Sequence, residues 1–459
     1  MRLKKFVAVL LTGALVLSSV ACGSNNKENT SAGAKATSES ESAGTDSDKG
    51  GSDKKVVIWA TTNDLKTWAE EYQKQTGKEV EVVVIQTADY PTKLATALGG
   101  KSDEVDVIMG EPQMLPNFFE AGYFEDLSAS YEADQYKDKI VDYVWQAGQD
   151  ADGHVRAISY QTTPGSVIYR RDIAKKVWGT DDPAEIGKKF ADFPTITKTG
   201  EELNGKGYKI FTDTGCLRWF AYSDSPWVKD GKLNLTDHIK AYMDTAVELY
   251  TKGYTAFAQE WSSTWMASMS GPIPADASEI MSDDDLKAYD GDTTEVFSYV
   301  LPSWGALIIR DNAGDLKGNY GVCKGPTSFF GGGSFIGINS YSKNKDAAWD
   351  FIKWVTLNDE SSQWWLEKSN GDVVSNKAVL EANKDFENES FGGQKTYEFF
   401  MQEAQNIDYS NVTRYDTDID KAWGTAIESV QKGEATKEDA INTFYASVQA
   451  IFPEIEIPQ

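Results

Sequence analysis

Histidine and cysteine are scarce in this chain. Its 459 residues include two histidines and three cysteines, too few for a zinc framework or for a fold held together by several disulfides. Basic residues are also in deficit, because 45 lysines and arginines face 71 aspartates and glutamates, a net charge of −26. Such a surface repels phosphate backbones, so we expect no nucleic-acid partner. We expect no cofactor and no bound metal either.

Apolar and aromatic residues are well represented. The chain is 40% hydrophobic and 25% charged, a composition that can bury sizeable cores, and its length is sufficient for two or three domains. It contains 14 tryptophans, 21 tyrosines and 20 phenylalanines. An acidic and aromatic-rich chain is typical of proteins that contact neutral ligands.

The first segment has the features of an export signal. Arg2, Lys4 and Lys5 precede an apolar stretch over residues 6–21, which is too short to span a membrane comfortably. The small residues before Cys22 resemble a bacterial lipoprotein signal, in which the cysteine is lipid-modified after cleavage, although Ser19 replaces the usual leucine. We therefore predict a lipoprotein signal peptide over residues 1–22, ending at the lipidated Cys22. The alternative is an ordinary secretory peptide with an incidental cysteine.

Residues 23–55 contain no aromatic and no large aliphatic side chain. Such a segment cannot form a core, so we predict a flexible tether with a mean reach of about 30 Å. With a lipid at its start, this tether would hold the protein at the extracellular face of the bacterial cytoplasmic membrane.

The body of the chain alternates between strand and helix patterns. Short apolar runs predict strands over 56–60, 80–85 and 105–109, separated by helical patterns over 64–76 and 88–98. This order predicts an α/β fold with a parallel sheet. Further along, the pattern predicts strands and helices as follows: strands over 165–169 and 335–338, and helices around 239–246, 348–355, 419–430 and 441–448.

Four stretches carry a family resemblance in the family's order: residues 106–127, 159–173, 332–349 and 371–375. Together they resemble the extracellular solute-binding proteins of sugar-importing ABC transporters, the group that includes maltose-binding protein. Two positions depart from the family's pattern. Arg170-Arg171 stands where most relatives carry Asn-Lys, and Val374 replaces the usual proline.

The resemblance implies two doubly wound α/β lobes joined by hinge crossings, with the ligand between them. Lobe one would comprise residues 54–164 plus 325–365, and lobe two residues 165–324 plus 366–459. It also implies a monomer whose partners are a carbohydrate ligand and the permease subunits of an ABC transporter, with membrane contact through the lipid anchor.

Ligands of open parallel sheets lie outside the carboxyl ends of the strands. The candidates that follow the predicted strands of lobe one are Trp59, Thr61, Asn63, Gln86, Thr87, Tyr90 and Glu111, with Gln161 added from the first crossing. Thr61 and Asn63 have an alternative use as helix caps. Glu111 would accept hydrogen bonds from a pair of sugar hydroxyls, or is a solvated carboxylate.

A sugar needs flat apolar surface for its C–H faces and polar side chains for its hydroxyls. Trp304 resembles the family's recurrent stacking tryptophan, with core packing as the alternative. The candidates of lobe two are Asp213, Trp219, Trp227, Trp265, Trp304, Tyr415 and Asp416. Trp261 and Trp265 are four residues apart, so a helix would place both on one face, where core packing is favoured; Trp423 is also expected in the core.

Three further patterns allow alternatives. The glycines at 331–333 lack the lysine of a phosphate-binding loop, so we expect them to permit a close backbone approach at the hinge or ligand. Cys216 and Cys323 would either pair or remain free. The spacing of Asp416, Asp418 and Asp420 is compatible with calcium, but a solvated acidic face is favoured because the EF-hand glycine and glutamate are missing.

The function that these features favour is the capture of a neutral oligosaccharide and its delivery to a permease, without catalysis. A secreted glycoside hydrolase is the first alternative, because a suitably spaced carboxylate pair would suffice; no catalytic signature supports it. A binding protein for a non-sugar solute such as a peptide is the second, since it needs only a different cleft lining.

Overall fold

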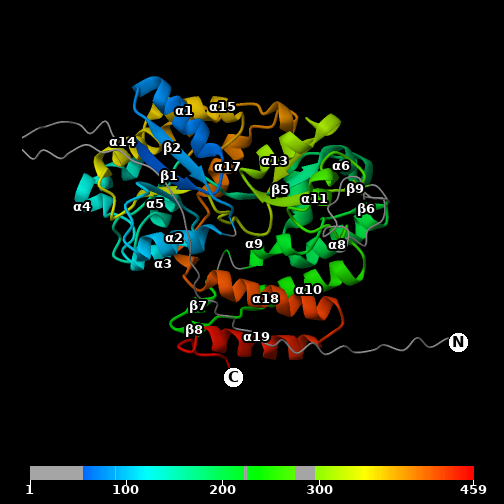
Figure 1. Ribbon diagram of the computed structural model, residues 1–459. Coiled ribbons are helices and arrows are strands. Elements are labelled where there is room, and N and C mark those ends of the chain that lie inside the picture. The colour runs from blue at the N-terminus through cyan, green and yellow to red at the C-terminus, as the bar shows by residue number, and fades with distance from the viewer. Residues whose placement is uncertain (1–54, 88, 222, 224, 274–294, 459) are drawn as a thin grey trace, which may run out of the picture. The chain divides into compact units, whose positions relative to one another are not determined.

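The computed structural model describes residues 55–87, 89–221, 223, 225–273 and 295–458 (Figure 1). The predicted signal peptide, Cys22 and the tether up to residue 54 lie outside the described residues. Within the described ranges, every helix is too short or too polar to cross a membrane.

The described elements alternate between strands and helices. The strands are β1 (Val56–Ala60), β2 (Val80–Val84), β3 (Val107–Gly110), β4 (Ile158–Ser159), β5 (Gly165–Arg170), β6 (Tyr208–Lys209), β7 (Val228–Lys229), β8 (Lys232–Leu233), β9 (Glu295–Val296), β10 (Ser298–Pro302), β11 (Tyr320–Cys323) and β12 (Phe335–Ile338). The principal helices are α1 (Asp64–Thr76), α2 (Tyr90–Gly99), α3 (Leu115–Glu120), α4 (Leu127–Tyr131), α5 (Asp142–Ala147), α6 (Arg171–Trp178), α7 (Pro183–Gly187), α8 (Phe193–Asn204), α9 (Arg218–Ala221), α10 (Asp237–Thr251), α11 (Ser263–Ser268), α13 (Gly305–Asn312), α14 (Lys345–Thr356), α15 (Asp359–Ser369), α16 (Lys377–Ala382), α17 (Thr396–Ala404), α18 (Asp416–Gln431) and α19 (Lys437–Ile451).

The first sheet has five strands in the order β2-β1-β3-β12-β4. β1 pairs in parallel with β2 and with β3, so the parallel arrangement predicted from the strand and helix order is confirmed for these three strands. β12 runs antiparallel to β3 and to β4. β12 comes far along the chain, after the strands β5, β10 and β11 in sequence, and it pairs back into this sheet.

The second sheet has three strands, with β5 between β10 and β11. Both pairings of β5 are antiparallel, a direction that the order of strands and helices did not predict. The presence of two sheets with helices between their strands confirms the α/β class.

The chain passes between the two sheets at two crossing segments, residues 160–164 and 324–334. Hydrogen bonds join them: the N–H of Gly331 donates to the carbonyl of Thr163 (2.9 Å), and the N–H of Gly165 donates to the carbonyl of Phe329 (2.8 Å). The hydroxyl of Ser303, just after β10, donates to the carbonyl of Thr162 (2.7 Å). The crossing segments are therefore fastened to each other and to the end of β10.

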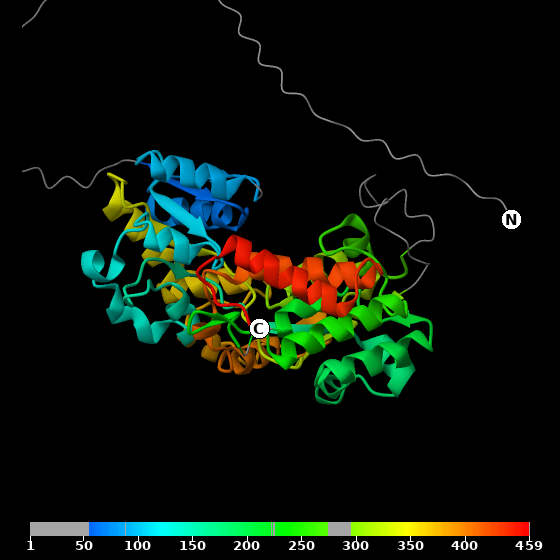
Figure 2. The same ribbon diagram turned by 90° about the horizontal axis from the view of Figure 1, so that it is seen from below.

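Amphipathic helices cover the sheets. In α1 the buried residues recur at helical spacing, and Gly77 ends the helix with φ +74°. Trp68 of α1 stacks on Trp365 of α15, with ring centroids 4.8 Å apart. Farther along the chain, α10, α18 and α19 lie side by side (Figures 1 and 2), and Trp423 of α18 is fully buried, as expected.

The glycines of the second crossing segment allow a close backbone approach, as predicted. A Cβ atom added to Gly331 would lie 2.0 Å from Cγ of Pro302, and Gly332 has φ +79°. Cys216 and Cys323 are buried and free, which decides between the two alternatives for these thiols.

Two glycine-to-alanine substitutions should have opposite effects on stability. Gly331→Ala forces a methyl group into the ring of Pro302 and should lower the free energy of unfolding by about 1–3 kcal/mol. Gly424→Ala, on an open face of α18, should raise it by roughly 0.5–1 kcal/mol. Urea unfolding of both variants measures the difference, and equal effects would contradict the close approach at Gly331.

Candidate functional site

The ends of the parallel strands bring several predicted residues to one edge of the first sheet. Trp59 is nearly buried, and the Nζ atom of Lys93 lies 4.7 Å from its ring centroid. The hydroxyl of Thr61 contacts the Sδ atom of Met109 at 3.7 Å. The Tyr90 hydroxyl lies 3.1 Å from the carbonyl oxygen of Trp59 and 2.5 Å from that of Met109. Tyr90 therefore joins the ends of β1 and β3 as a structural residue.

The remaining first-sheet candidates are accessible. Asn63, Gln86 and Thr87 are exposed, and Glu111 is half-buried and accepts a hydrogen bond from the Gln113 amide (2.5 Å). Asn63 occupies the N-cap position of α1, but its side chain makes no capping hydrogen bond. Its amide is thus not committed to capping the helix, while its role in ligand binding stays a prediction.

Gln161 has a structural task in the first crossing segment. Its side-chain amide donates to the Asp372 carboxylate (2.9 Å), and its carbonyl oxygen accepts a hydrogen bond from the N–H of Ser334 (3.3 Å). The residue is 6% exposed. Both ends of the amide are used within the protein, so Gln161 joins both crossing segments to the segment around Asp372.

The buried carboxyl of Asp372 has a raised pKa. Its carboxylate also accepts a hydrogen bond from the Trp365 indole (2.8 Å). Burial raises the pKa of this carboxyl to about 6, against the partial opposition of the hydrogen bonds from Gln161 and Trp365. Between about pH 4 and pH 6 the folded protein therefore retains a proton on Asp372 that the unfolded chain has already released.

In the second half of the site, Asp213 connects two loops. Its carboxylate accepts hydrogen bonds from the N–H groups of Gly215 (2.6 Å) and Glu260 (2.8 Å). Burial raises the pKa of Asp213 to about 7, and the neighbouring charge of Glu260 adds to the shift. The Glu260 carboxylate pairs with the guanidinium of Arg218 at 2.9 Å. Asp213 is therefore occupied in holding the Glu260 loop.

The predicted tryptophans divide into buried and accessible rings. Trp227, a predicted ligand residue, is instead 1% exposed and packs against Trp423 and Phe444, so it is a core residue. Trp219 is half-buried and stacks on Phe329 of the second crossing segment, with centroids 5.4 Å apart. Trp265 is buried against Tyr299 of β10.

Trp304 lies at the crossing segments. It follows β10, is half-buried, and its indole N–H donates to the carbonyl of Gly331 at 2.9 Å. Trp261 stacks on it, with centroids 5.7 Å apart and planes 29° from parallel. The prediction that one helix carries both Trp261 and Trp265 is wrong, because α11 begins at Ser263 and Trp261 lies in the loop before it with φ +71°.

The C-terminal candidates lie at the start of α18, with Tyr415 at its N-cap and Asp416 as its first residue. Tyr415 packs edge-on against Phe452, with centroids 5.0 Å apart. The Asp416 carboxylate accepts hydrogen bonds from the N–H and hydroxyl of Thr413 (2.9 and 2.5 Å). Burial raises the pKa of Asp416 to about 6. Within the described ranges there is no group of three or more His, Cys, Asp or Glu residues arranged to hold a metal ion.

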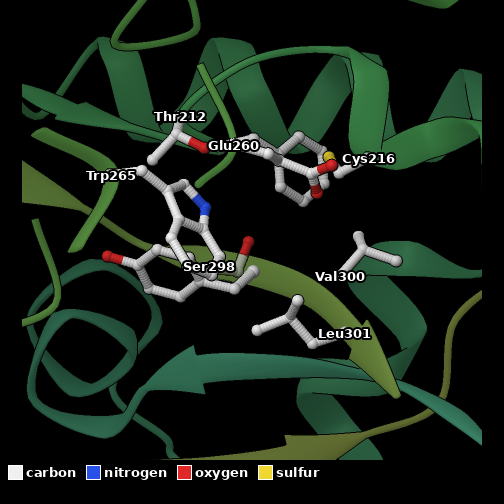
Figure 3. A pocket seen from close by; sticks show the side chains of 9 residues that line it. Thr212, Cys216, Glu260, Trp265, Ser298, Val300 and Leu301 are labelled. Carbon is white, nitrogen blue, oxygen red and sulfur yellow. The ribbon is translucent and has the colours of Figure 1, made fainter. Parts of the chain in front are cut away.

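A small pocket lies next to Trp265 and β10 (Figure 3). It is lined by Trp265 from α11, Cys216 from the turn before α9, Glu260, and residues of β10. It leaves no room for a water molecule, whereas typical small-molecule sites enclose roughly 300–1,000 Å³. The pocket is therefore too small to enclose an oligosaccharide.

Sequence reasoning missed two residues that the tertiary structure brings to this place. Glu260 forms an ion pair with Arg218. Trp261 has the most exposed large aromatic ring among the described residues, at 55%. The available signal was the pair of tryptophans at 261 and 265, which the helical interpretation assigned to the core.

The sequence profile of the family described as bacterial extracellular solute-binding protein matches residues 67–391. The chain belongs to this family. The family is one of solute-binding proteins, in agreement with the resemblance of the four sequence stretches.

Solved structures of this family share the fold of the chain. A structure of an extracellular solute-binding protein of family 1 is 19% identical, with a TM-score of 0.69 over 86% of this chain and 99% of that one. The ABC-transporter-associated binding protein of B. animalis subsp. lactis, solved with β-1,6-galactobiose, is 20% identical, with a TM-score of 0.66 over 88% and 99%. The galacto-N-biose/lacto-N-biose I-binding protein of Bifidobacterium longum, in complex with lacto-N-biose, is 16% identical, with a TM-score of 0.67 over 90% and 100%.

The raised pKa of Asp372 predicts a pH-dependent contribution to stability. The unfolded carboxyl releases its proton near pH 4 and the folded one near pH 6. Raising the pH from 4 to 7 should therefore lower the stability of the wild type relative to Asp372→Asn by about 2 kcal/mol. Urea unfolding of both proteins at several pH values measures this difference.

Asp385→Asn provides the control for this measurement. Asp385 is exposed, and its pairing with Lys395 lowers its pKa, so its contribution should be small and of opposite sign. A difference between wild type and Asp372→Asn that does not change with pH would contradict the buried, protonated state of Asp372.

Proposed function

We propose that this protein binds a neutral oligosaccharide between two lobes and delivers it to the permease subunits of an ABC importer, without a chemical step of its own. The observation that supports this most is the position of Trp304. Its indole is bonded directly to the second crossing segment, where a bound sugar ring would contact both halves of the protein.

The chemistry of the candidate residues suits a sugar. Indole rings offer flat apolar surface for the C–H faces of a pyranose, and the exposed amide of Asn63 and the carboxylate of Glu111 offer partners for its hydroxyls. Relatives of this fold have been solved with β-1,6-galactobiose and lacto-N-biose, both neutral disaccharides. A buried sugar hydroxyl without a partner costs about 1–3 kcal/mol, which gives such a site its selectivity.

The proposed lobes are organised by the two sheets. The chain changes sheet between Ser159 and Gly165 and again between Cys323 and Phe335, close to the predicted boundaries at 164/165 and 324/325. Lys377 pairs with Asp142, and the Asn376 amide donates to Asp359. These contacts favour starting the last segment of lobe two after α16 rather than at residue 366.

In this proposal, ligand binding shifts a hinge equilibrium. A sugar that contacts both lobes binds the closed arrangement better than the open one, and it populates that arrangement by the difference in affinity. In this proposal the crossing segments, residues 160–164 and 324–334, carry the motion, because the chain passes between the two sheets there.

A saccharide titration tests the function. Tryptophan fluorescence of the wild type should change saturably with at least one of maltose, maltotriose, β-1,6-galactobiose and lacto-N-biose. Trp304→Ala should weaken that binding at least about tenfold, equivalent to about 1.4 kcal/mol, because aromatic surface beside the crossing segments is lost.

Trp178→Ala is the matched control. Trp178 is half-buried on α6, where its indole N–H donates to Glu202, and its removal should leave the affinity unchanged. No response to any saccharide would overturn the proposal, and release of new reducing ends from the same sugars would instead support a glycoside hydrolase.

We further propose that Cys22 carries a lipid that holds the protein on the outer face of the cytoplasmic membrane. In a bacterial host, Cys22→Ser should abolish the incorporation of labelled palmitate and move the protein from the membrane fraction to the medium. Cys323→Ser, a change at a buried thiol, should do neither. Retention of the Cys22→Ser variant in the membrane fraction would contradict the lipid anchor.

A further inference from the structure

The loop between α10 and α11 holds two bulky side chains in an unfavourable backbone conformation. Phe257 has φ +55° and Trp261 has φ +71°. L-residues with large side chains rarely adopt this left-handed region, because the side chain crowds the backbone. Such strain persists only where surrounding contacts impose it, and it is concentrated at functional positions.

The contacts that impose this conformation are present on both sides of Trp261. On one side, the N–H of Glu260 donates to Asp213, and the Glu260 carboxylate pairs with Arg218. On the other, the hydroxyl of Ser262 accepts a hydrogen bond from the N–H of Trp265 (3.1 Å) and caps α11. The loop is therefore fastened immediately before and after Trp261.

This arrangement leaves the Trp261 indole 55% exposed. Burying a ring of this size would be favourable, yet the loop holds it outside the core. One face packs on Trp304, and the ring also contacts Trp265, whose centroid is 5.0 Å away. Trp261 thus contacts both the buried Trp265 and the half-buried Trp304, and it is the most exposed of the three indoles.

We propose that Trp261 is the ring on which a sugar of the bound ligand stacks, with Trp304 supporting it from behind. This inference rests on the proposed function and specifies its binding surface. Trp261 covers one face of Trp304 and is itself 55% exposed, so its exposed surface is the flat apolar area available to a pyranose. Asp213 is a positioning residue, because it holds the backbone of Glu260 next to Trp261.

Trp261→Gly provides the sharpest test, because glycine adopts φ +71° without strain. The melting temperature should stay the same or rise by a few degrees, whereas binding of the saccharide identified from maltose, maltotriose, β-1,6-galactobiose and lacto-N-biose should weaken at least about tenfold. Isothermal titration calorimetry and thermal unfolding measure both effects. A purely structural role for Trp261 would instead lower the melting temperature.

Phe257→Gly is the matched control in the same loop. Phe257 has the same kind of backbone strain and packs against Tyr250, with centroids 5.1 Å apart. Its replacement should leave the saccharide affinity within about twofold. Equal losses of affinity in both variants would show that loop order alone matters and would overturn the assignment to Trp261.

A double-mutant cycle tests the positioning role of Asp213. Asp213→Asn removes one of two acceptor oxygens and should weaken binding in the wild type, but should have no further effect in the Trp261→Gly background. Additive losses would overturn the positioning role. If the wild type binds a saccharide and Trp261→Gly binds it equally well, the inference fails and the proposed function stands; if the wild type binds none, both fail.

Discussion

The hydrogen-bonded group around Gln161 holds together the place where the chain changes sheet. One amide donates to Asp372 and accepts from Ser334, and neighbouring backbone bonds join Thr163 to Gly331. Buried polar groups of this kind are costly when unsatisfied, so the register of the crossing segments is strongly specified. Residues that are bonded to those segments are therefore also fixed in position, and Trp304, whose indole donates to Gly331, is the main example.

A second constraint acts locally in the loop before α11. The backbone of this loop is strained at two aromatic residues, and hydrogen bonds that Asp213 and Ser262 accept from backbone N–H groups compensate. Carboxylates with raised pKa values lie in both regions, Asp372 beside the crossing segments and Asp213 beside the loop. In each case burial is the principal cause of the raised pKa. The carboxylates are buried because they accept hydrogen bonds from backbone N–H or amide groups inside the protein.

The element order and the family were predictable from the sequence. β1, α1, β2, α2 and β3 lie where the periodicity predicted them, because apolar spacing and the Gly77 stop act within a few residues. The position of α18 and the burial of Trp423 followed from the same local pattern. The direction of the second sheet did not, since antiparallel pairing of β5 with β10 joins residues more than a hundred positions apart.

The candidate site divides in the same way. By itself, the sequence determined which residue types follow the parallel strands, and therefore that Thr61, Asn63 and Glu111 share one edge of a sheet. Only the tertiary structure decided that Tyr90 and Gln161 are occupied by internal hydrogen bonds, that Trp227 is buried, and that Trp261 is exposed. The reason is physical: the exposure of a ring depends on contacts such as that between Asp213 and Glu260, 47 residues apart, and no local pattern encodes them.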